Sequence, residues 1–291
     1  ATGRRVYPVQ GWLVALAACV LLVFSVFLIL KNRRLEKEVA ARTAGNSMLD
    51  RILGPNATVT IVGSDALHFQ SQLRENEISN LADYASMDPA SSPESPANLP
   101  ERFDAIKEFP LIHGDEVRAA VRVARRLASG ADVRFVHARN ISMNEFQRGG
   151  NFVVLGGRRA NPWAALFEKG LQFEMVFLSA STSGIFLNRS PREGEQSEYR
   201  AHTKDSQNGI AYGRLAILPG LYGNGKVVLI AGTTGETTFA ATDFLTRRRG
   251  LEQVEKLIGG EVDTNLTHLE VLLETSTVAG KTLDYRIAAV R

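Results

Sequence analysis

Cysteine is almost absent from this sequence: its 291 residues include one cysteine, Cys19. An internal disulfide is therefore excluded, and the fold must be held together by packing of a core. An excess of one charge is also lacking, because the net charge is only +3. A weak net charge gives no whole-molecule basis for binding nucleic acid. We expect no nucleic-acid partner.

Motifs for metal binding and covalent catalysis are missing as well. The five histidines are scattered, with no H-E-x-x-H and no C-x-x-C, so we expect no metal site. Ser181 and Ser183 lie in LSASTSGIF, which lacks the G-x-S-x-G nucleophile elbow. No catalytic residue and no cofactor can be assigned, and there is no internal repeat of the kind that marks solenoids or propellers.

A long apolar run near the start is the clearest positive signal. Residues 11–30, GWLVALAACVLLVFSVFLIL, contain no charged side chain. Twenty helical residues span about 30 Å, the thickness of the hydrocarbon core of a bilayer. A cleaved signal peptide would have a shorter apolar region and a cleavage site, whereas here a basic stretch follows. We expect a short tail (1–10), a transmembrane helix (11–30) and the lipid bilayer as a partner.

The basic residues around the run do not fix the side of the membrane. Two arginines precede it and four basic residues follow it: Arg4 and Arg5, then Lys31, Arg33, Arg34 and Lys37. That count favours a cytoplasmic domain, but long domains cross membranes largely regardless of charge. The side stays open.

Composition divides the rest of the chain into a linker and one domain. Residues 31–55 are expected to form a juxtamembrane helix and linker, and residues 56–291 one soluble domain. Within it, residues 86–102 are rich in proline and serine and are expected to form a loop. The segment GDEVRAAVRVARRLASG predicts a helix from residue 114 to about residue 129. Its buried face is expected to comprise Val117, Ala120, Val121, Ala124 and Leu127, with the arginines on a solvated outer face.

Strands and helices alternate after this helix, for example NFVVL before N-P-W-A-A-L-F-E, and KVVLIAG before TTFAATDFL. Asn161 and Pro162 have the N-cap and first-turn chemistry of a helix start. This alternation predicts an α/β sandwich: a mixed sheet with a parallel core and antiparallel hairpin extensions.

The stretch Gly220 to Lys226 reads G-x-x-x-x-G-K and is one residue short of a nucleotide-binding P-loop. A P-loop requires Ser or Thr after the lysine and then a helix. Here Val227 follows, in a β-branched run typical of a strand, and Asn224-Gly225 favours a hairpin turn. We predict a turn between two strands.

Three other turns form the candidate anion site: Gly63 to Asp65, Gly156 to Asn161, and Gly232 to Gly235. Each follows a strand that is expected to be buried, and the carboxyl ends of parallel strands are where open α/β folds bind ligands. Thr233 and Glu236 also match a capping box, which would satisfy the helix donors internally, and the three loops could simply end their strands. The candidate residues for a small anionic ligand are Ser64, Asp65, Arg158, Arg159, Asn161, Thr233 and Thr234.

Three stretches resemble a group of functionally uncharacterised, membrane-anchored bacterial proteins of acidobacterial type over most of residues 58–291: NFVVLGGRRANPWAALFEKGLQFEM, FLNRSPREGEQSEY and YGRLAILPGLYGNGKVVLIAGTTGETTFAATDFL. Some relatives carry a winged-helix DNA-binding module before the span. That arrangement implies an extracytoplasmic domain with a sensory or scaffolding role. Only ten residues precede the span here, so we expect no such module. The resemblance transfers no catalytic residue.

Together these features predict a single-pass membrane protein whose α/β domain acts as a sensor, a binding module or an accessory subunit of a membrane assembly. The alternative is a scaffold subunit that binds protein partners or forms a homo-oligomer, without a small ligand. An enzyme with a cryptic site is the third hypothesis and ranks last.

Overall fold

The computed structural model describes residues 25, 31, 47–54, 56–75, 80–87, 111–127, 131–177, 184–203, 208–278 and 281–291. The chain divides into two compact units, Ala1–Ala44 and Gly45–Arg291. The predicted tail lies outside the described residues, and so do the predicted span, apart from Ser25, and most of the 86–102 loop. Among the described residues, no helix combines the length and the apolar character needed to cross a bilayer. The anchor therefore stays a prediction.

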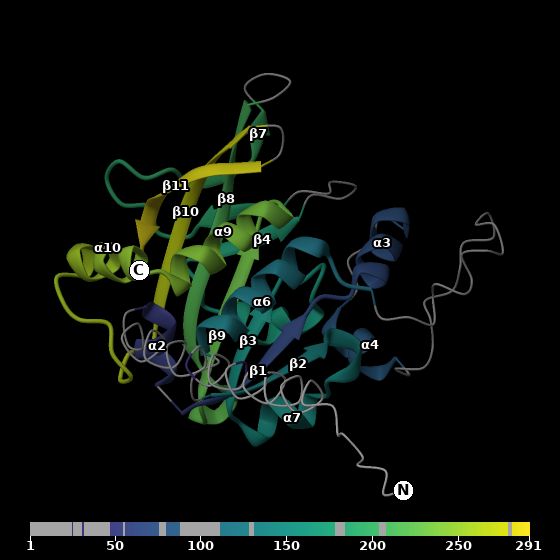
Figure 1. Cartoon of the computed structure of the whole chain (residues 1–291). Helices are drawn as coiled ribbons and strands as arrows, with labels where there is room; N and C mark the ends of the chain where they lie inside the picture. Colours follow the sequence, from purple (N-terminus) through teal and green to yellow (C-terminus); the bar gives the residue numbers. More distant parts are fainter. Residues whose placement is uncertain are drawn as a thin grey trace, which may run out of the picture. The chain divides into compact units, whose positions relative to one another are not determined.

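The second unit is built on an eight-stranded mixed sheet (Figure 1), with the strand order β11-β10-β8-β9-β3-β1-β2 and β7 paired to β8. Four adjacent strands are parallel: β2 (Asp132–His137), β1 (Thr58–Gly63), β3 (Asn151–Leu155) and β9 (Lys226–Gly232). The others add antiparallel: β8 (Asn208–Pro219), β10 (Leu269–Val278), β11 (Lys281–Val290) and β7 (His202–Thr203). The predicted α/β class, a parallel core with antiparallel extensions, is confirmed.

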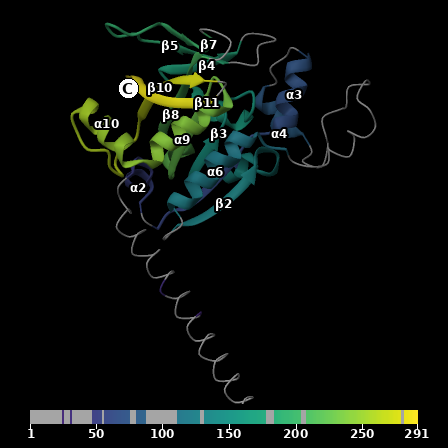
Figure 2. The same cartoon turned by 45° about the horizontal axis from the view of Figure 1, so that its top comes forward.

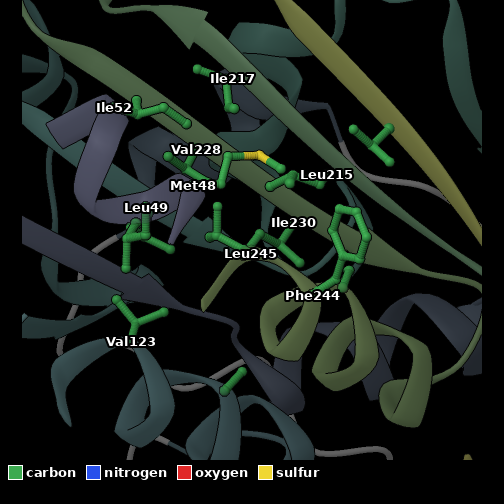
Figure 3. Close-up of a cluster of buried hydrophobic side chains, with 14 of the residues drawn as sticks. Met48, Leu49, Ile52, Val123, Leu215, Ile217, Val228, Ile230, Phe244 and Leu245 are labelled. Atoms are coloured by element: carbon green, nitrogen blue, oxygen red, sulfur yellow. The ribbon is translucent and has the colours of Figure 1, made fainter. Parts of the chain in front are cut away.

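Helices cover both faces of the sheet (Figure 2). One core contains side chains from four helices: α2 (Met48–Leu53), α6 (Gly114–Leu127), α9 (Gly235–Thr246) and α10 (Arg248–Ile258). Figure 3 shows Met48, Val123 and Phe244 lying with strand side chains in this core. The opposite core receives α4 (Leu81–Ser86), α7 (Met143–Arg148), η3 (Pro162–Ala164) and α8 (Ala165–Glu168). The remaining helical segments are α3 (Ala66–Glu75), η2 (Ala138–Asn140) and η4 (Leu221–Gly223).

Helix α2 belongs to the globular unit, although the sequence placed residues 31–55 in a helix and linker. Ser47 caps α2 by accepting a hydrogen bond from Asp50 N and by donating its hydroxyl to the Asp50 carboxylate. Met48 and Leu49 are fully buried. Because burying such side chains stabilises a fold by about 2 kcal/mol each, the compact unit extends back to Gly45.

Helix α6 has the predicted position but a different buried face. It buries Ala119, Ala120 and Val123 together with Glu116 and Leu127, whereas Val117 and Val121 are 44% and 51% exposed. The arginines do not form a purely solvated face. Arg122 contacts Asp243 on α9 at 2.6 Å, and Arg126 forms an ion pair with Asp50 of α2. The predicted buried face is therefore wrong in part: α6 is rotated about its axis because it packs against α9.

A second sheet of three strands lies beside the main one: β4 (Phe173–Phe177), β5 (Gly184–Asn188) and β6 (Glu198–Arg200). Two buried charged residues attach it to the main sheet. Glu270 of β10 accepts hydrogen bonds from Gln172 N at 2.8 Å and Phe173 N at 3.0 Å. Arg214 of β8 donates to Phe173 O at 2.8 Å and pairs with Glu168 at 3.3 Å. The small sheet is thereby fixed at its first strand.

The P-loop-like segment is a turn between two strands, as predicted. The predicted hairpin turn at Asn224-Gly225 is wrong, because the turn includes the helix η4 and Asn224 has a φ of −91°. Strands β8 and β9 pair antiparallel, with Pro219 opposite Lys226. Gly225 takes a φ of +80°, which its missing Cβ permits. The Lys226 ammonium contacts Leu266 O, and a strand follows the lysine in place of a helix. The segment lacks the architecture that cradles a phosphate.

Candidate ligand-binding cleft

The carboxyl ends of three parallel strands meet at one edge of the main sheet. Strand β1 lies between β2 and β3, and β3 pairs with β9. The chain leaves β1 for β2 on one side and then continues to β3 on the other, so the strand order reverses at β1. In open α/β sheets a crevice forms outside the carboxyl ends at such a switch point.

A cleft of about 300 Å³ occupies this edge, at the lower end of the range for small-molecule sites. One wall is glycine-rich backbone that follows β3 and β9, and the other wall is apolar and comes from β4, β5 and α3. The lining comprises Phe69, His113, Glu116, Gly156, Gly157, Ala160, Met175, Phe177, Gly184, Gly232, Thr233, Thr234, Gly235 and Thr238.

Glu116, in the first turn of α6, carries the carboxyl group of the cleft. The Ser64 backbone N–H, at the end of β1, donates to Glu116 Oε2 at 2.9 Å. The Ser64 hydroxyl lies 3.1 Å from His113 Nδ1. Gly156 takes a φ of +94°, and a Cβ there would lie 2.9 Å from Glu116 Oε1. The positive φ and the close approach together explain a glycine at this turn.

The electrostatics of the cleft centre on Glu116 and His113. Burial raises the pKa of Glu116 to about 7, against the lowering effect of its hydrogen bonds from Ser64. Burial lowers the pKa of His113, against the raising effect of Asp115 and Asp65. A carboxyl group that titrates near neutrality can donate or accept a hydrogen bond. The cleft therefore contains a buried carboxyl group with a raised pKa beside an imidazole with a lowered pKa.

Helix α9 begins at the cleft, and its N-cap lies one residue later than the sequence predicted. The capping box is formed by Thr234 and Thr237, and the predicted pair of Thr233 and Glu236 is wrong. Thr233 instead continues the ladder beside β8, because its N–H donates to Tyr212 O and its hydroxyl accepts from Tyr212 N. The Thr234 side chain accepts a hydrogen bond from Thr237 N. The N–H groups of Gly235 and Glu236, in the first turn, have no acceptor within the helix.

Of the predicted site residues, Thr233 and Thr234 line the cleft, and Ser64 lies behind its wall, fully buried against Glu116. Asp65 is directed elsewhere: it caps α3 through His68 N at 3.0 Å and pairs with Arg139 at 2.9 Å. The Asp65 carboxylate therefore has a structural role outside the cleft.

The predicted arginines and asparagine do not line the cleft. Arg159 is fully buried, with its guanidinium 5.8 Å from the centre of the Phe177 ring. The Asn161 side chain donates to Val62 O at 3.2 Å and Leu155 O at 2.9 Å, which ties the turn to two strands. Arg158 also lies outside the lining. The positive charge that we expected beside Thr233 and Thr234 is therefore not on the cleft wall.

Sequence reasoning missed Glu116 and His113. No motif surrounds Glu116 in the sequence, and His113 is one of five scattered histidines. The signal that could have identified Glu116 is a carboxylate in the first turn of a helix, on the face of the helix that is buried. No group of three or more His, Cys, Asp or Glu side chains is placed to hold a metal ion within the described ranges.

Fold and cleft together define an α/β protein with a mixed sheet, covered on both faces, and a crevice at its switch point. In comparisons with protein-family models, curated proteins and solved structures, none matches this chain.

Proposed function

We propose that this chain is a single-pass membrane protein whose α/β domain is a sensor or binding module for a small ligand held in the cleft. The observation that carries this proposal is the convergence of three strand ends, two helix starts and one buried carboxyl group at a cavity of about 300 Å³. A role as accessory subunit of a membrane assembly is compatible with the same cleft.

The ligand class follows from the lining. Glu116 offers a hydrogen-bond acceptor, or a negative charge when ionised, and the arginines that would favour an anion lie outside the cleft wall. Phe69, Met175 and Phe177 offer an apolar surface. We therefore favour a small, uncharged or cationic ligand with hydrogen-bond donors and an apolar part, over the anion that the sequence suggested.

A matched set of probes tests this proposal. 2-Phenylethylamine, 2-phenylethanol and phenylacetate share one skeleton and differ in charge. Thermal unfolding of the full chain in mild detergent should show stabilisation by the amine, and less by the alcohol. Ligand present at ten times its dissociation constant stabilises by about 1.4 kcal/mol. Glu116→Gln should remove the preference for the amine.

An occluding variant and its control separate the cleft from other sites. Ala160→Leu adds bulk at the cleft wall and should abolish the shift, whereas Ala85→Leu, on the exposed side of α4, should leave it unchanged. If only phenylacetate stabilised the protein, the result would favour an anionic ligand and contradict the proposed ligand class. If none of the three probes stabilised the protein and nothing small co-purified with it, the sensor proposal would fail and the scaffold alternative would lead.

A further inference from the structure

Strand β2 is an open edge of the main sheet. It pairs with β1 on one side, and no described strand pairs with it on the other. An edge strand presents unpaired N–H and C=O groups, which are a template for another strand. Charged residues often protect such edges, and here Asp132 and Arg134 alternate along the strand.

An exposed apolar patch borders this edge. We define the edge patch as Val117, Val121 and Phe135, which are 44%, 51% and 44% exposed. Val117 and Val121 lie one turn apart on α6. Arg122 reaches Asp243 on α9 from the opposite flank of α6, so the valine flank is the one directed toward β2. The neighbouring position of α6 and β2 can be followed in Figure 2.

The charges on β2 are complementary to a second copy of β2. In an antiparallel pair whose two-fold axis passes at Val133, Asp132 of each copy lies opposite Arg134 of the other. Moving the axis by one residue in either direction places Asp132 opposite Asp132, or Arg134 opposite Arg134, which destabilises a sheet. The Arg134 side chain contacts Glu145 and is still 54% exposed, so it remains accessible to a partner.

We propose that a second copy of this chain docks antiparallel on the β2 edge, with the two-fold axis at Val133. The two main sheets then form one continuous sheet, and the two α6 helices lie on the same face of it. In this register Phe135 of each copy lies opposite Ala131 of the other, so the docked partner covers part of each edge patch. This self-association is isologous, as in most symmetric dimers, and it does not depend on whether the cleft binds a ligand.

A charge swap tests the register. The full chain in mild detergent should be a dimer by light scattering and native mass spectrometry. Arg134→Asp places like charges opposite each other twice and should raise the dimer dissociation constant about tenfold or more. The double variant Asp132→Arg/Arg134→Asp restores opposite charges and should return the constant to within about threefold of the wild type. The proposal would be overturned if Arg134→Asp left the dimer dissociation constant unchanged, or if the wild type were a monomer.

Cross-linking provides an independent measurement. In a Cys19→Ser background, Val133→Cys should form a disulfide-linked dimer under mild oxidation, because the two copies of residue 133 face each other. Glu193→Cys, exposed in a loop of the small sheet, should not form one. Equal cross-linking of both variants, or of neither, would contradict the predicted junction.

Discussion

The Ser64 backbone N–H donates a 2.9 Å hydrogen bond to Glu116 Oε2, across 52 positions of sequence. This bond joins the end of β1 to the start of α6 and holds a carboxyl group at the switch point of the sheet. Glu116 is only 4% exposed, and burial raises its pKa to about 7. This contact therefore positions, at the edge of the cleft, a carboxyl group whose charge changes with pH near neutrality.

Glu116→Gln should change how stability depends on pH. The folded protein holds the Glu116 proton more tightly than the unfolded chain, because the folded pKa is about 7 against an ordinary value of 4.5. The contribution of this group is fully present below pH 4.5 and is lost as pH rises toward 7 and above. Relative to the glutamine variant, the wild type should lose up to roughly 3 kcal/mol across that window.

Urea unfolding of both proteins between pH 4.5 and 8 measures this effect as a difference in free energy of unfolding. His68, His113 and His137 have pKa values lowered by burial, which gives the opposite trend. Both proteins contain these histidines, so their contribution largely cancels in the difference. A difference that stays flat with pH would show that the Glu116 pKa is not raised.

Asp65→Asn should destabilise the domain by about 3–5 kcal/mol, because it leaves the Arg139 guanidinium without its buried carboxylate partner. The amide oxygen can still cap α3 at His68 N. Glu198→Gln is the matched control, because it breaks an exposed ion pair with Arg200 and should cost less than about 1 kcal/mol. Chemical denaturation of both variants gives the two values, and equal costs would refute a structural role for Asp65.

Glu270→Ala should loosen the small sheet more than the main sheet. The change removes the acceptor for Gln172 N and Phe173 N, and each buried donor left unpaired costs about 1–3 kcal/mol. Hydrogen exchange should show faster exchange in β4 and β5, with β1 and β3 protected as before. Glu274→Ala, on the same strand but paired with exposed Arg286, is the control. Uniform loss of protection would argue against a local attachment.

The membrane anchor has its own test. Leu16→Arg with Val20→Arg places two charges in the middle of the apolar run 11–30. Each charge costs about 2.5–3.5 kcal/mol on insertion scales, so the double variant should leave the membrane fraction. Leu16→Ile with Val20→Leu keeps the run apolar and should remain there. Membrane fractionation that is the same for both variants would exclude the anchor.

The coarse fold could be predicted from the sequence because its signals are local. The runs at β3 and β9 are near-continuous apolar stretches rich in valine, leucine and isoleucine, as strands buried on both faces are. A turn between β8 and β9 could be predicted from backbone sterics, but its length and the φ of −91° at Asn224 could not. The three loops at the carboxyl edge followed from the parallel arrangement of β1, β3 and β9. Such inferences need no knowledge of side-chain partners.

The failures concern partners that are distant in sequence. The buried face of α6 depends on α9, because Arg122 contacts Asp243 there, and helical periodicity alone allowed a rotated face. The capping box moved by one residue because Thr233 bonds to Tyr212 in a neighbouring strand. Arg159 looked like a surface cation next to a turn, yet it is fully buried and packs near Phe177.

The attachment of the small sheet has a consequence for recognition. Glu270 accepts hydrogen bonds from Gln172 N and Phe173 N, and Arg214 donates to Phe173 O. These contacts lie at the start of β4, the strand that carries Met175 and Phe177 to the cleft. We expect a wall anchored in this way to keep its position when a ligand binds, unlike the lobe of a hinged receptor. For the proposed ligand this predicts a size limit that is set by the cleft as it stands, so that molecules much larger than about 300 Å³ should not bind.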